Sequence, residues 1–309
     1  MPITIPEGLP ACESLRKEGL IVNSPTPPAS AATAARPLRI GLLNLMPTKE
    51  RTELQFLRLL GRSAHHVEAA LLRMESHESR GAPPGHMEKY YTGAGKAISG
   101  KDRLDALVIT GAPVEALPFR EVGYWRELCE LFDTLDESEE RIISTLHICW
   151  GAQAALYRRY GIAKKPLEKK LFGVFPYKAS AEGIFRGFQG EFLAPQSRHT
   201  ESDRRAMAEN PRIAIRAESA EAGILAATAR GGREVYVSGH FEYDGDTLAL
   251  EYRRDLAKGL DIAIPKNYFP HDDSAKEPEA RWKSAANLFF ENWLDFIRDG
   301  TRRRAGVKA

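Results

Sequence analysis

The first half of the chain alternates between short apolar runs and longer amphipathic segments. Apolar runs at residues 38–45, 65–74 and 104–113 predict strands that are covered on both faces, as parallel strands are. Between the first two, TKERTELQFLRLLGRS carries leucines on one stripe and predicts a helix that ends at Gly61. A polar stretch, residues 75–103, separates the second and third strands.

The same alternation continues beyond the third strand. A helix is expected over residues 123–135, RIISTLHICW reads as a fourth strand, and GAQAALYRRYGI continues as a helix that ends at Gly161. Strands of this kind, alternating with helices, predict an open, doubly wound α/β domain with a mostly parallel sheet flanked by helices over roughly residues 38–162.

The second half carries shorter elements that would extend or flank the same sheet. Two alternating runs on either side of Gly231 and Gly232 predict a β-hairpin. Near the end, WKSAANLFFENWLDFIRDG has apolar residues at helical spacing and predicts a packed closing helix.

The predicted domain organisation is one large domain with two extensions. Residues 24–37 are rich in Pro, Ala, Ser and Thr, which disfavours regular structure. We therefore expect an N-terminal arm over residues 1–37, a single α/β domain over 38–300, and a basic tail over 301–309.

Composition narrows the class of function. With 309 residues, 43% of them hydrophobic, the chain can bury a sizeable core. Its 44 Lys and Arg against 42 Asp and Glu leave a net charge of +2, which gives no whole-chain electrostatic argument for nucleic acid or a membrane. A small-molecule substrate is the expected partner.

The cysteines and the N-terminus bear on the compartment. Cys12, Cys129 and Cys149 follow neither a disulfide framework nor a zinc-binding pattern, which favours a reducing environment. The N-terminal residues lack a signal-like apolar segment, and no apolar run approaches the roughly 20 residues of a membrane span. We therefore expect a cytoplasmic protein.

The strongest local signal is the strand TLHI that runs through Cys149 into a helix beginning with Trp150 and two small residues. Such a strand–turn–helix is the outline of a nucleophile elbow, which lifts its nucleophile above the carboxyl ends of the strands. The helix N-terminus favours the thiolate, and the backbone N–H of Trp150 points where an oxyanion would develop. Buried free cysteines are also common as core packing, so the turn alone does not decide.

A proton partner for the cysteine stands in VYVSGHFEYD. His240 follows a strand-like run, and Glu242, two residues on, would share its face in an extended segment. A carboxylate beside the imidazole fixes its tautomer and favours the imidazolium. A strand-end histidine with a solvated glutamate is the alternative, but the order Cys…His…Glu favours a catalytic set.

Two further groups bear on binding. The segment PQSRHTE places Ser197, Arg198, His199 and Glu201 in an expected loop after Pro195, which suits either the polar groups of a small zwitterion or a solvated turn. The His65-His66 pair and the run HDD at 271–273 offer metal ligands, but no third ligand follows at a helical or hairpin spacing. No metal site is expected.

Many motifs in order give the chain a specific resemblance. RPLRIGLLNLMPTKERTELQFLRLLGRS, VITGAPVE, ICWGAQAALY, KLFGVF, FLAP, SRHTE, EYD and IPKNYFP resemble the bacterial homoserine O-acyltransferases, which are distantly related to class I glutamine amidotransferases. The resemblance covers nearly the whole chain. It implies an α/β fold like that of these amidotransferases, a homodimer, no bound cofactor, and acyl-CoA as co-substrate in methionine biosynthesis.

The resemblance also implies roles for individual residues. Cys149 would carry the acyl group as a thioester, His240 would accept the proton of the incoming hydroxyl, and Glu242 would support it. Residues implied to contact the amino-acid substrate are Lys170, Ser197 and Arg254, and Lys49 is implied as an oxyanion or substrate contact near the active site. An Arg suits the α-carboxylate because it can pair with it bidentately.

The acyl donor depends on Glu115. In the family a Glu at this position goes with acetyl-CoA and a Gly with succinyl-CoA, and a carboxylate both narrows the pocket and repels a succinyl carboxylate. The resemblance therefore predicts acetyl transfer to homoserine.

The sequence departs from the family pattern at two positions. Phe241 replaces a Pro between His240 and Glu242, and Gln196 stands where a His is common. Homoserine O-succinyltransferase and serine O-acetyltransferase therefore remain alternatives. A glutaminase-type amidotransferase is less consistent, because its Gly two residues before the cysteine is His147 here.

Overall fold

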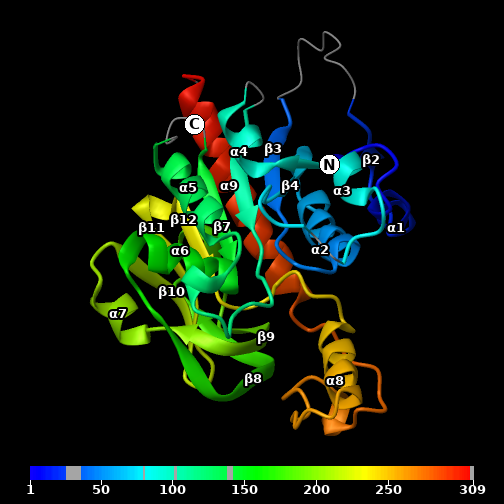
Figure 1. The fold of residues 1–309 in the computed structure, drawn as a ribbon, viewed down its shortest axis with the longest axis vertical. Helices are drawn as coiled ribbons and strands as arrows, with labels where there is room; N and C mark the ends of the chain where they lie inside the picture. The colour runs from blue at the N-terminus through cyan, green and yellow to red at the C-terminus, as the bar shows by residue number, and fades with distance from the viewer. Residues whose placement is uncertain (26–35, 79–80, 101–102, 138–141, 307–309) are drawn as a thin grey trace. The chain divides into compact units, whose positions relative to one another are not determined.

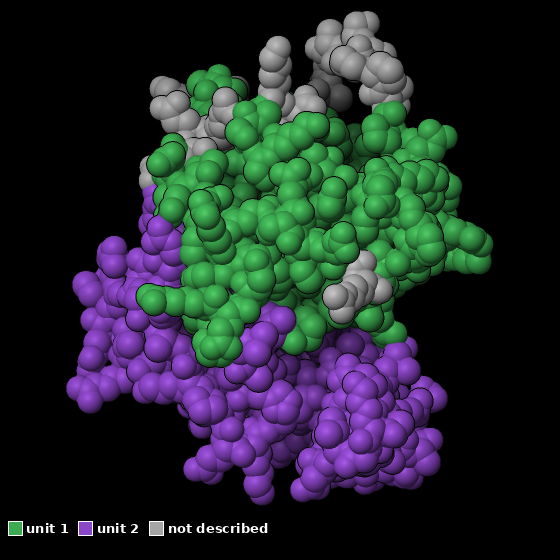
Figure 2. All heavy atoms as spheres, in the orientation of Figure 1, with its two compact units in different colours: residues 1–113, 118–146, 290–309 green, residues 114–117, 147–289 purple. Residues whose placement is uncertain are grey.

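The computed structural model describes residues 1–25, 36–78, 81–100, 103–137 and 142–306. Within these residues, no helix combines the length and the apolar character needed to cross a membrane. The described chain forms two compact units, coloured separately in Figure 2: residues 1–113, 118–146 and 290–309 make unit 1, and residues 114–117 and 147–289 make unit 2.

Unit 1 is built on parallel strands. Its strand order is β2-β1-β4-β3-β6-β7, with β5 beside β4 (Figure 1). The strands are β1 (Ile3–Thr4), β2 (Val22–Asn23), β3 (Leu38–Leu43), β4 (Val67–Arg73), β5 (Tyr91–Gly93), β6 (Ala106–Ile109) and β7 (Ser144–Ile148), whose last two residues belong to unit 2. In β3 and β6 nearly every side chain is buried, which is the reason these strands read as continuous apolar runs.

Helices connect the parallel strands of unit 1. They are α1 (Ala11–Lys17), α2 (Lys49–Gly61), α3 (His86–Tyr90), α4 (Ala94–Ser99) and α5 (Trp125–Glu137), together with α9 (Lys283–Arg304), which belongs to unit 1 from Phe290 onward. Phe56 of α2 contacts Phe290 of α9, and the indole of Trp293 donates to Ser144 Oγ at the start of β7. The closing helix predicted from apolar spacing is therefore confirmed, and its apolar side chains pack as part of the core.

Unit 2 contains an antiparallel sheet and the helix that follows β7. The strand order is β12-β11-β10-β8-β9, and neighbouring strands in this order pair in antiparallel fashion. The elements are α6 (Trp150–Tyr160), β8 (Lys164–Ala179), β9 (Glu191–Ser202), α7 (Arg204–Glu209), β10 (Ile213–Ser219), β11 (Gly223–Ala229), β12 (Glu234–Val237) and α8 (Thr247–Ala257). The hairpin at Gly231 and Gly232 is confirmed, and both glycines have positive φ.

The structure differs from the expected boundaries at the two ends. The expected N-terminal arm contains β1, α1 and β2. β1 pairs in parallel with β4, and Ile3 and Ile5 are fully buried. Its Pro-rich residues 26–35 lie outside the described chain. At the other end α9 continues to Arg304, so the expected basic tail begins inside a helix, and residues 307–309 lie outside the described chain.

Candidate active site

Cys149 lies in the sharp turn between β7 and α6. Its φ of 49° and ψ of −115° are unusual for a residue with a side chain. The turn is held on both sides: the N–H of Cys149 donates to Val237 O at 2.7 Å, and its carbonyl accepts from Ala152 N at 3.0 Å. The predicted elbow is therefore present, with a strained cysteine at the N-terminus of an 11-residue helix.

His240 and Glu242 are in direct contact. Nδ1 of His240 lies 2.7 Å from Oε1 of Glu242, and both residues are buried. The segment is not extended, as the sequence analysis expects, but turns, with Tyr243 N donating to His240 O at 3.3 Å. The turn places the two side chains together although Phe241 stands between them.

The charges around His240 favour its protonated form. Burial lowers the pKa of His240, but the negative charges of Glu242 and Cys149 and hydrogen bonds with both side chains together raise it well above its usual value. The described site therefore contains a thiol, an imidazole and a carboxylate in series. Such a set can form a thiolate–imidazolium pair and can move a proton between the sulfur and an incoming group.

Tyr243 is a neighbour of the imidazole that the sequence analysis did not single out. Its ring stacks on His240 with 4.1 Å between centroids and 13° between planes. Its hydroxyl donates to Oε1 of Glu251, on α8, at 3.1 Å. Neither the stacking nor the link to α8 has a signal in the sequence, because no element was predicted over residues 247–257.

The three residues implied to contact the amino-acid substrate meet on two carboxylates of α8. Ser197 donates to Oε2 of Glu251, and Lys170 Nζ lies 3.5 Å from the same oxygen and 3.4 Å from Oδ2 of Asp255. Arg254 pairs with Oδ1 of Asp255 at 2.7 Å. Lys170, Ser197 and Arg254 thus lie in one polar cluster, and Glu251 connects it through Tyr243 to His240.

The expected loop around Ser197 is a strand. PQSRHTE lies within β9, which pairs with β8 over most of its length. The loop prediction was wrong because the Pro and the polar residues were read as turn signals, whereas alternate side chains here are buried: Gln196, Arg198 and Thr200. A strand holds Ser197 more rigidly than a loop would.

Glu115 is half-buried and bound at one oxygen by three donors. Oε2 accepts from His199 N at 2.9 Å, Thr200 N at 3.1 Å and Thr200 Oγ1 at 3.1 Å. Thr200 Oγ1 also lies 3.1 Å from Oε1 of Gln153, one turn into α6. Glu115 is therefore connected, through Thr200 and Gln153, to the helix that begins after Cys149.

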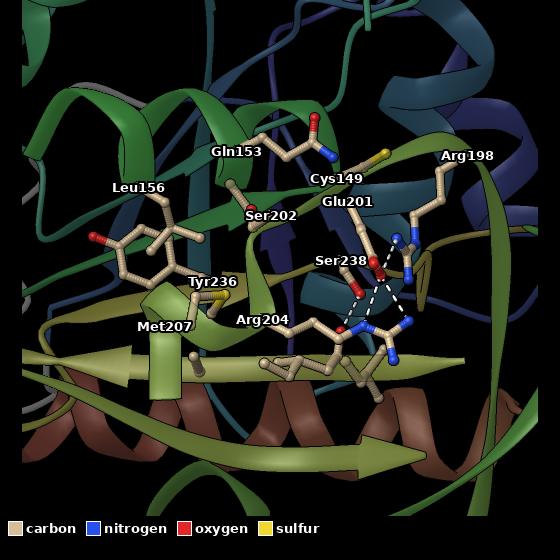
Figure 3. Close-up of a pocket in the computed structure, with 14 residues that line it drawn as sticks. Cys149, Gln153, Leu156, Arg198, Glu201, Ser202, Arg204, Met207, Tyr236 and Ser238 are labelled. Atoms are coloured by element: carbon tan, nitrogen blue, oxygen red, sulfur yellow. Dashed lines mark hydrogen bonds and ion pairs between the residues drawn. The ribbon is translucent and has the colours of Figure 1, made fainter. Parts of the chain in front are cut away.

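Cys149 also forms part of the wall of a pocket in unit 2 (Figure 3). Leu156, Met207 and Tyr236 gather on one side of the view, whereas Arg198, Glu201 and Arg204 lie on the other. Glu201 pairs with Arg204 at 2.7 Å and lies 3.7 Å from Arg198. The carboxylate of Glu201 therefore offsets only one of the two positive charges that line this pocket.

Lys49 begins α2 and is buried in unit 1. Its Nζ donates to Asn44 O at 2.6 Å, and burial lowers the pKa of Lys49 to about 8, although the charge of Glu53 acts in the opposite direction. Glu53 in turn accepts from Tyr91 at 2.6 Å and contacts His86 at 2.8 Å. A buried amine that titrates near neutral pH is typical of a functional lysine, but it also occurs in structural networks.

The histidines that were weighed as metal ligands have local partners. His66 Nε2 lies 2.9 Å from Thr4 Oγ1. His65 lies 2.8 Å from Oδ1 of Asp295 and 3.8 Å from Oε1 of Glu291, so the fold supplies a group of three donors that the sequence spacing could not predict. All three residues are partly exposed, and a hydrogen bond between His65 and Asp295 accounts for the shortest of these contacts.

Three residues depart from the patterns expected of the acyltransferase family or of the amidotransferases, and each makes defined contacts in the structure. Phe241 is buried against Phe289 at 4.9 Å between ring centroids, and Gln196 Nε2 donates to Tyr177 at 2.7 Å. His147 stacks on Tyr236 with 5.1 Å between centroids. The position where an amidotransferase would need Gly is therefore filled by an aromatic stack.

Solved structures that resemble the chain include glutamine amidotransferases, and they show the fold alone. One from Thermotoga maritima has a TM-score of 0.59 at 14% identity, covering 85% of this chain and 99% of that chain. Another, from Methylobacillus flagellatus, has a TM-score of 0.51 at 11% identity, covering 86% of this chain and 96% of that one. The predicted α/β fold, with a mostly parallel sheet flanked by helices, is confirmed.

Relatives of similar sequence are named as homoserine O-acetyltransferases. The protein of that name from Brevibacillus brevis is 47% identical and covers 96% of this chain and 95% of its own length. Those from Acetivibrio thermocellus and Bacteroides fragilis are 48% and 45% identical, each covering 96% of this chain and at least 95% of its own. A family described as Homoserine O-succinyltransferase matches residues 2–302, and the chain belongs to this family.

Proposed function

We propose that the protein transfers an acetyl group from acetyl-CoA to the hydroxyl of L-homoserine through a thioester on Cys149. The observation that carries the proposal is the series Cys149–His240–Glu242 at a strained elbow. The sequence family supports an acyltransferase rather than a glutaminase, whose fold is similar. The relatives named above support homoserine as the acceptor and acetyl-CoA as the donor.

In the first half-reaction the Cys149 thiolate attacks the thioester carbonyl of acetyl-CoA. The C–S bond to CoA breaks as the new C–S bond to Cys149 forms, and the imidazolium of His240 gives its proton to the departing CoA thiolate. We propose that the backbone N–H of Trp150, the first residue of α6, stabilises the oxyanion, as the N–H after the nucleophile does in other elbows. The role of Lys49 stays a prediction from the family resemblance.

In the second half-reaction His240, now neutral, takes the proton of the homoserine hydroxyl. The oxygen attacks the acetyl carbonyl, and the Cys149 thiolate leaves, which restores the thiolate–imidazolium pair. Glu242 holds Nδ1 of His240 at 2.7 Å and so stabilises the imidazolium in both directions. We propose that Arg254 pairs with the α-carboxylate of homoserine, with Lys170 and Ser197 as further contacts.

Our choice of acetyl-CoA as the donor draws on Glu115. The family description names succinyl transfer, whereas the relatives at 45–48% identity are named for acetyl transfer. We favour acetyl, because a fixed carboxylate at residue 115 leaves less room for a succinyl group and repels its charge.

Mass spectrometry of the intact protein tests the covalent scheme. Incubation with acetyl-CoA and no acceptor should add one acetyl group, and peptide mapping should locate it at Cys149. Addition of homoserine should then remove it and yield O-acetylhomoserine, whereas Cys149→Ala should stay unmodified. An unmodified wild-type protein that still turns over both substrates would rule out the thioester.

A matrix of initial rates tests the substrates. Acetyl-, succinyl- and propionyl-CoA should each be paired with homoserine and with serine, and we expect the acetyl-CoA and homoserine pair to be fastest. A faster rate with serine would instead support serine O-acetyltransferase. We also propose a homodimer that works in the cytoplasm, and the molar mass from light scattering tests the first of these expectations.

A further inference from the structure

His240 has a second support besides Glu242. The Tyr243 ring lies almost parallel to the imidazole, with 13° between planes and 4.1 Å between centroids, and both side chains are buried. Glu242 fixes one edge of the imidazole in its own plane through Nδ1, but it does not prevent the ring from tilting about that contact. A parallel ring against one face does prevent it.

The Tyr243 ring is itself anchored at its far end. Its hydroxyl donates to Oε1 of Glu251 at 3.1 Å, and the other oxygen of Glu251 accepts from Ser197. Burial and the charge of Glu251 raise the pKa of Tyr243 well above its usual value, so the hydroxyl stays protonated and continues to donate. The stacked ring therefore has a fixed position.

A stacked phenol ring also stabilises the positively charged form of the imidazole. The face of an aromatic ring carries negative potential and attracts a cation lying over it, and the attraction is stronger where water is excluded. The imidazolium that pairs with the Cys149 thiolate lies in such a place, because His240 is only 4% exposed and Tyr243 only 8%.

We infer that Tyr243 is a positioning residue for the proposed reaction, which holds the His240 ring in the plane that joins Glu242 to Cys149 and favours its protonated form. The inference rests on the catalytic role proposed for Cys149 and His240. It adds Tyr243, the residue directly after Glu242, to the residues that act on the imidazole. It also explains the link between His240, the proposed catalytic base, and the polar cluster that contains Lys170, Ser197 and Arg254.

The test is a pH titration of His240 in the protein without substrates, in which NMR monitors the C–H signals of the imidazole. The titratable groups that act on His240 in the described chain are Cys149, Glu242 and Tyr243. Strand β9 contributes only the uncharged carbonyl of Pro195, which accepts a hydrogen bond from the backbone N–H of His240. Tyr243→Leu removes the aromatic face, so the midpoint should move to lower pH. Tyr243→Phe keeps the face and should titrate close to wild type.

Acylation kinetics supply the second readout. Single-turnover release of CoA should be slower in Tyr243→Leu on the order of tenfold, the size expected for a lost cation–π contact at a buried site. Tyr243→Phe keeps the ring face to which we attribute the tenfold effect on acylation. It should therefore acylate at a rate within about twofold of wild type. Should Tyr243→Leu fail to fold, Tyr243→Met fills a similar volume without an aromatic face, and the same shifts are expected.

The chain offers a matched control. Tyr236 also stacks on a histidine, His147, at 5.1 Å and 17°, and its hydroxyl donates to Glu234 at 2.7 Å. Tyr236→Leu should lower thermal stability but leave the His240 midpoint in place. An unchanged midpoint in folded Tyr243→Leu, or an equal shift in Tyr236→Leu, overturns the inference. Because this titration needs no substrate, a failure of Cys149 to acquire acetyl would overturn the proposed function separately.

Discussion

Thr200 donates a hydrogen bond from Oγ1 to Oε2 of Glu115 across 3.1 Å. The backbone N–H groups of His199 and Thr200 donate to the same oxygen, so an edge of β9 fixes the carboxylate from three directions. A carboxylate held in this way cannot turn aside for a larger ligand. The donor selectivity that we propose for Glu115 should therefore depend on Thr200 as well.

Replacing Glu115 should change the preferred donor. In Glu115→Gly the lost carboxylate leaves space and removes the repulsion of a succinyl group, so the ratio of kcat/KM for succinyl-CoA to that for acetyl-CoA should rise at least about tenfold, or roughly 1.4 kcal/mol. Glu115→Gln separates the two causes, because it removes the charge and keeps the volume. An unchanged ratio in Glu115→Gly would remove Glu115 from the specificity site.

Thr200→Val should relax the same preference without touching Glu115. Valine keeps the shape of the side chain but loses the hydroxyl, so Oε2 of Glu115 retains two donors of three. We expect the acetyl preference to fall by severalfold, the size of one hydrogen bond to a charged group that is partly exposed. Thr200→Ser keeps the hydroxyl and should preserve the wild-type ratio.

The sequence was most informative where a local pattern determines local structure. Continuous apolar runs identified β3, β4 and β6, and the join of a strand to small residues identified the elbow at Cys149. Contacts that depend on distant pairing had no such pattern. The polar segment PQSRHTE was read as a loop because strand β8, which pairs with it, covers its alternate residues only in the folded chain.

The candidate site shows the same limit. His240 and Glu242 were found because they are two residues apart, although a turn rather than a strand brings them together. Glu251 contacts Ser197 and Lys170 from positions 54 and 81 residues away, and no spacing rule connects them. The resemblance supplied Lys170 and Arg254, whereas the carboxylates that hold them required the structure.

Glu242→Gln should alter both activity and the pH dependence of stability. The pKa of His240 is raised in the folded protein, so its contribution to stability is fully present below the unfolded value of about 6.5 and is lost as pH rises through the folded value. Without the charge of Glu242 the folded pKa falls, and this decline should become shallower. We also expect kcat to drop by about 10²- to 10⁴-fold.

Denaturant unfolding at a series of pH values measures this effect. The exposed carboxylate of Glu191 offers a control, because Glu191→Gln removes a charge without contacting His240. Parallel stability profiles for wild type and Glu242→Gln would show that Glu242 does not set the protonation of His240.

Lys49→Met should raise stability at neutral pH while lowering activity. The pKa of Lys49 falls from an ordinary 10.5 to about 8 on burial, so below pH 8 the folded protein carries the full cost of a buried cation. At 1.36 kcal/mol per pKa unit this cost is up to about 3 kcal/mol, and it is relieved as pH rises from about 8 to 10.5. The stability gain of the variant should shrink over the same interval, and a gain independent of pH would contradict the burial argument.

Gly239→Ala should damage the site through the backbone that carries His240. A Cβ at residue 239 would lie 2.8 Å from Pro195 O and 2.9 Å from Gln196 Nε2, closer than packed atoms tolerate. The His240 N–H donates to the same Pro195 carbonyl at 3.0 Å, so relief of the clash must lengthen this bond and move the imidazole away from Cys149. We expect a loss of about 1–3 kcal/mol in the free energy of unfolding, as for other overpacked sites, together with slower acylation of Cys149 by acetyl-CoA.

Gly245→Ala is the matched control, because its Cβ would meet only the Cβ of Ala280 at 3.4 Å, and it should acylate at the wild-type rate. Equal acylation rates in both variants would show that the approach of residue 239 to β9 does not position His240.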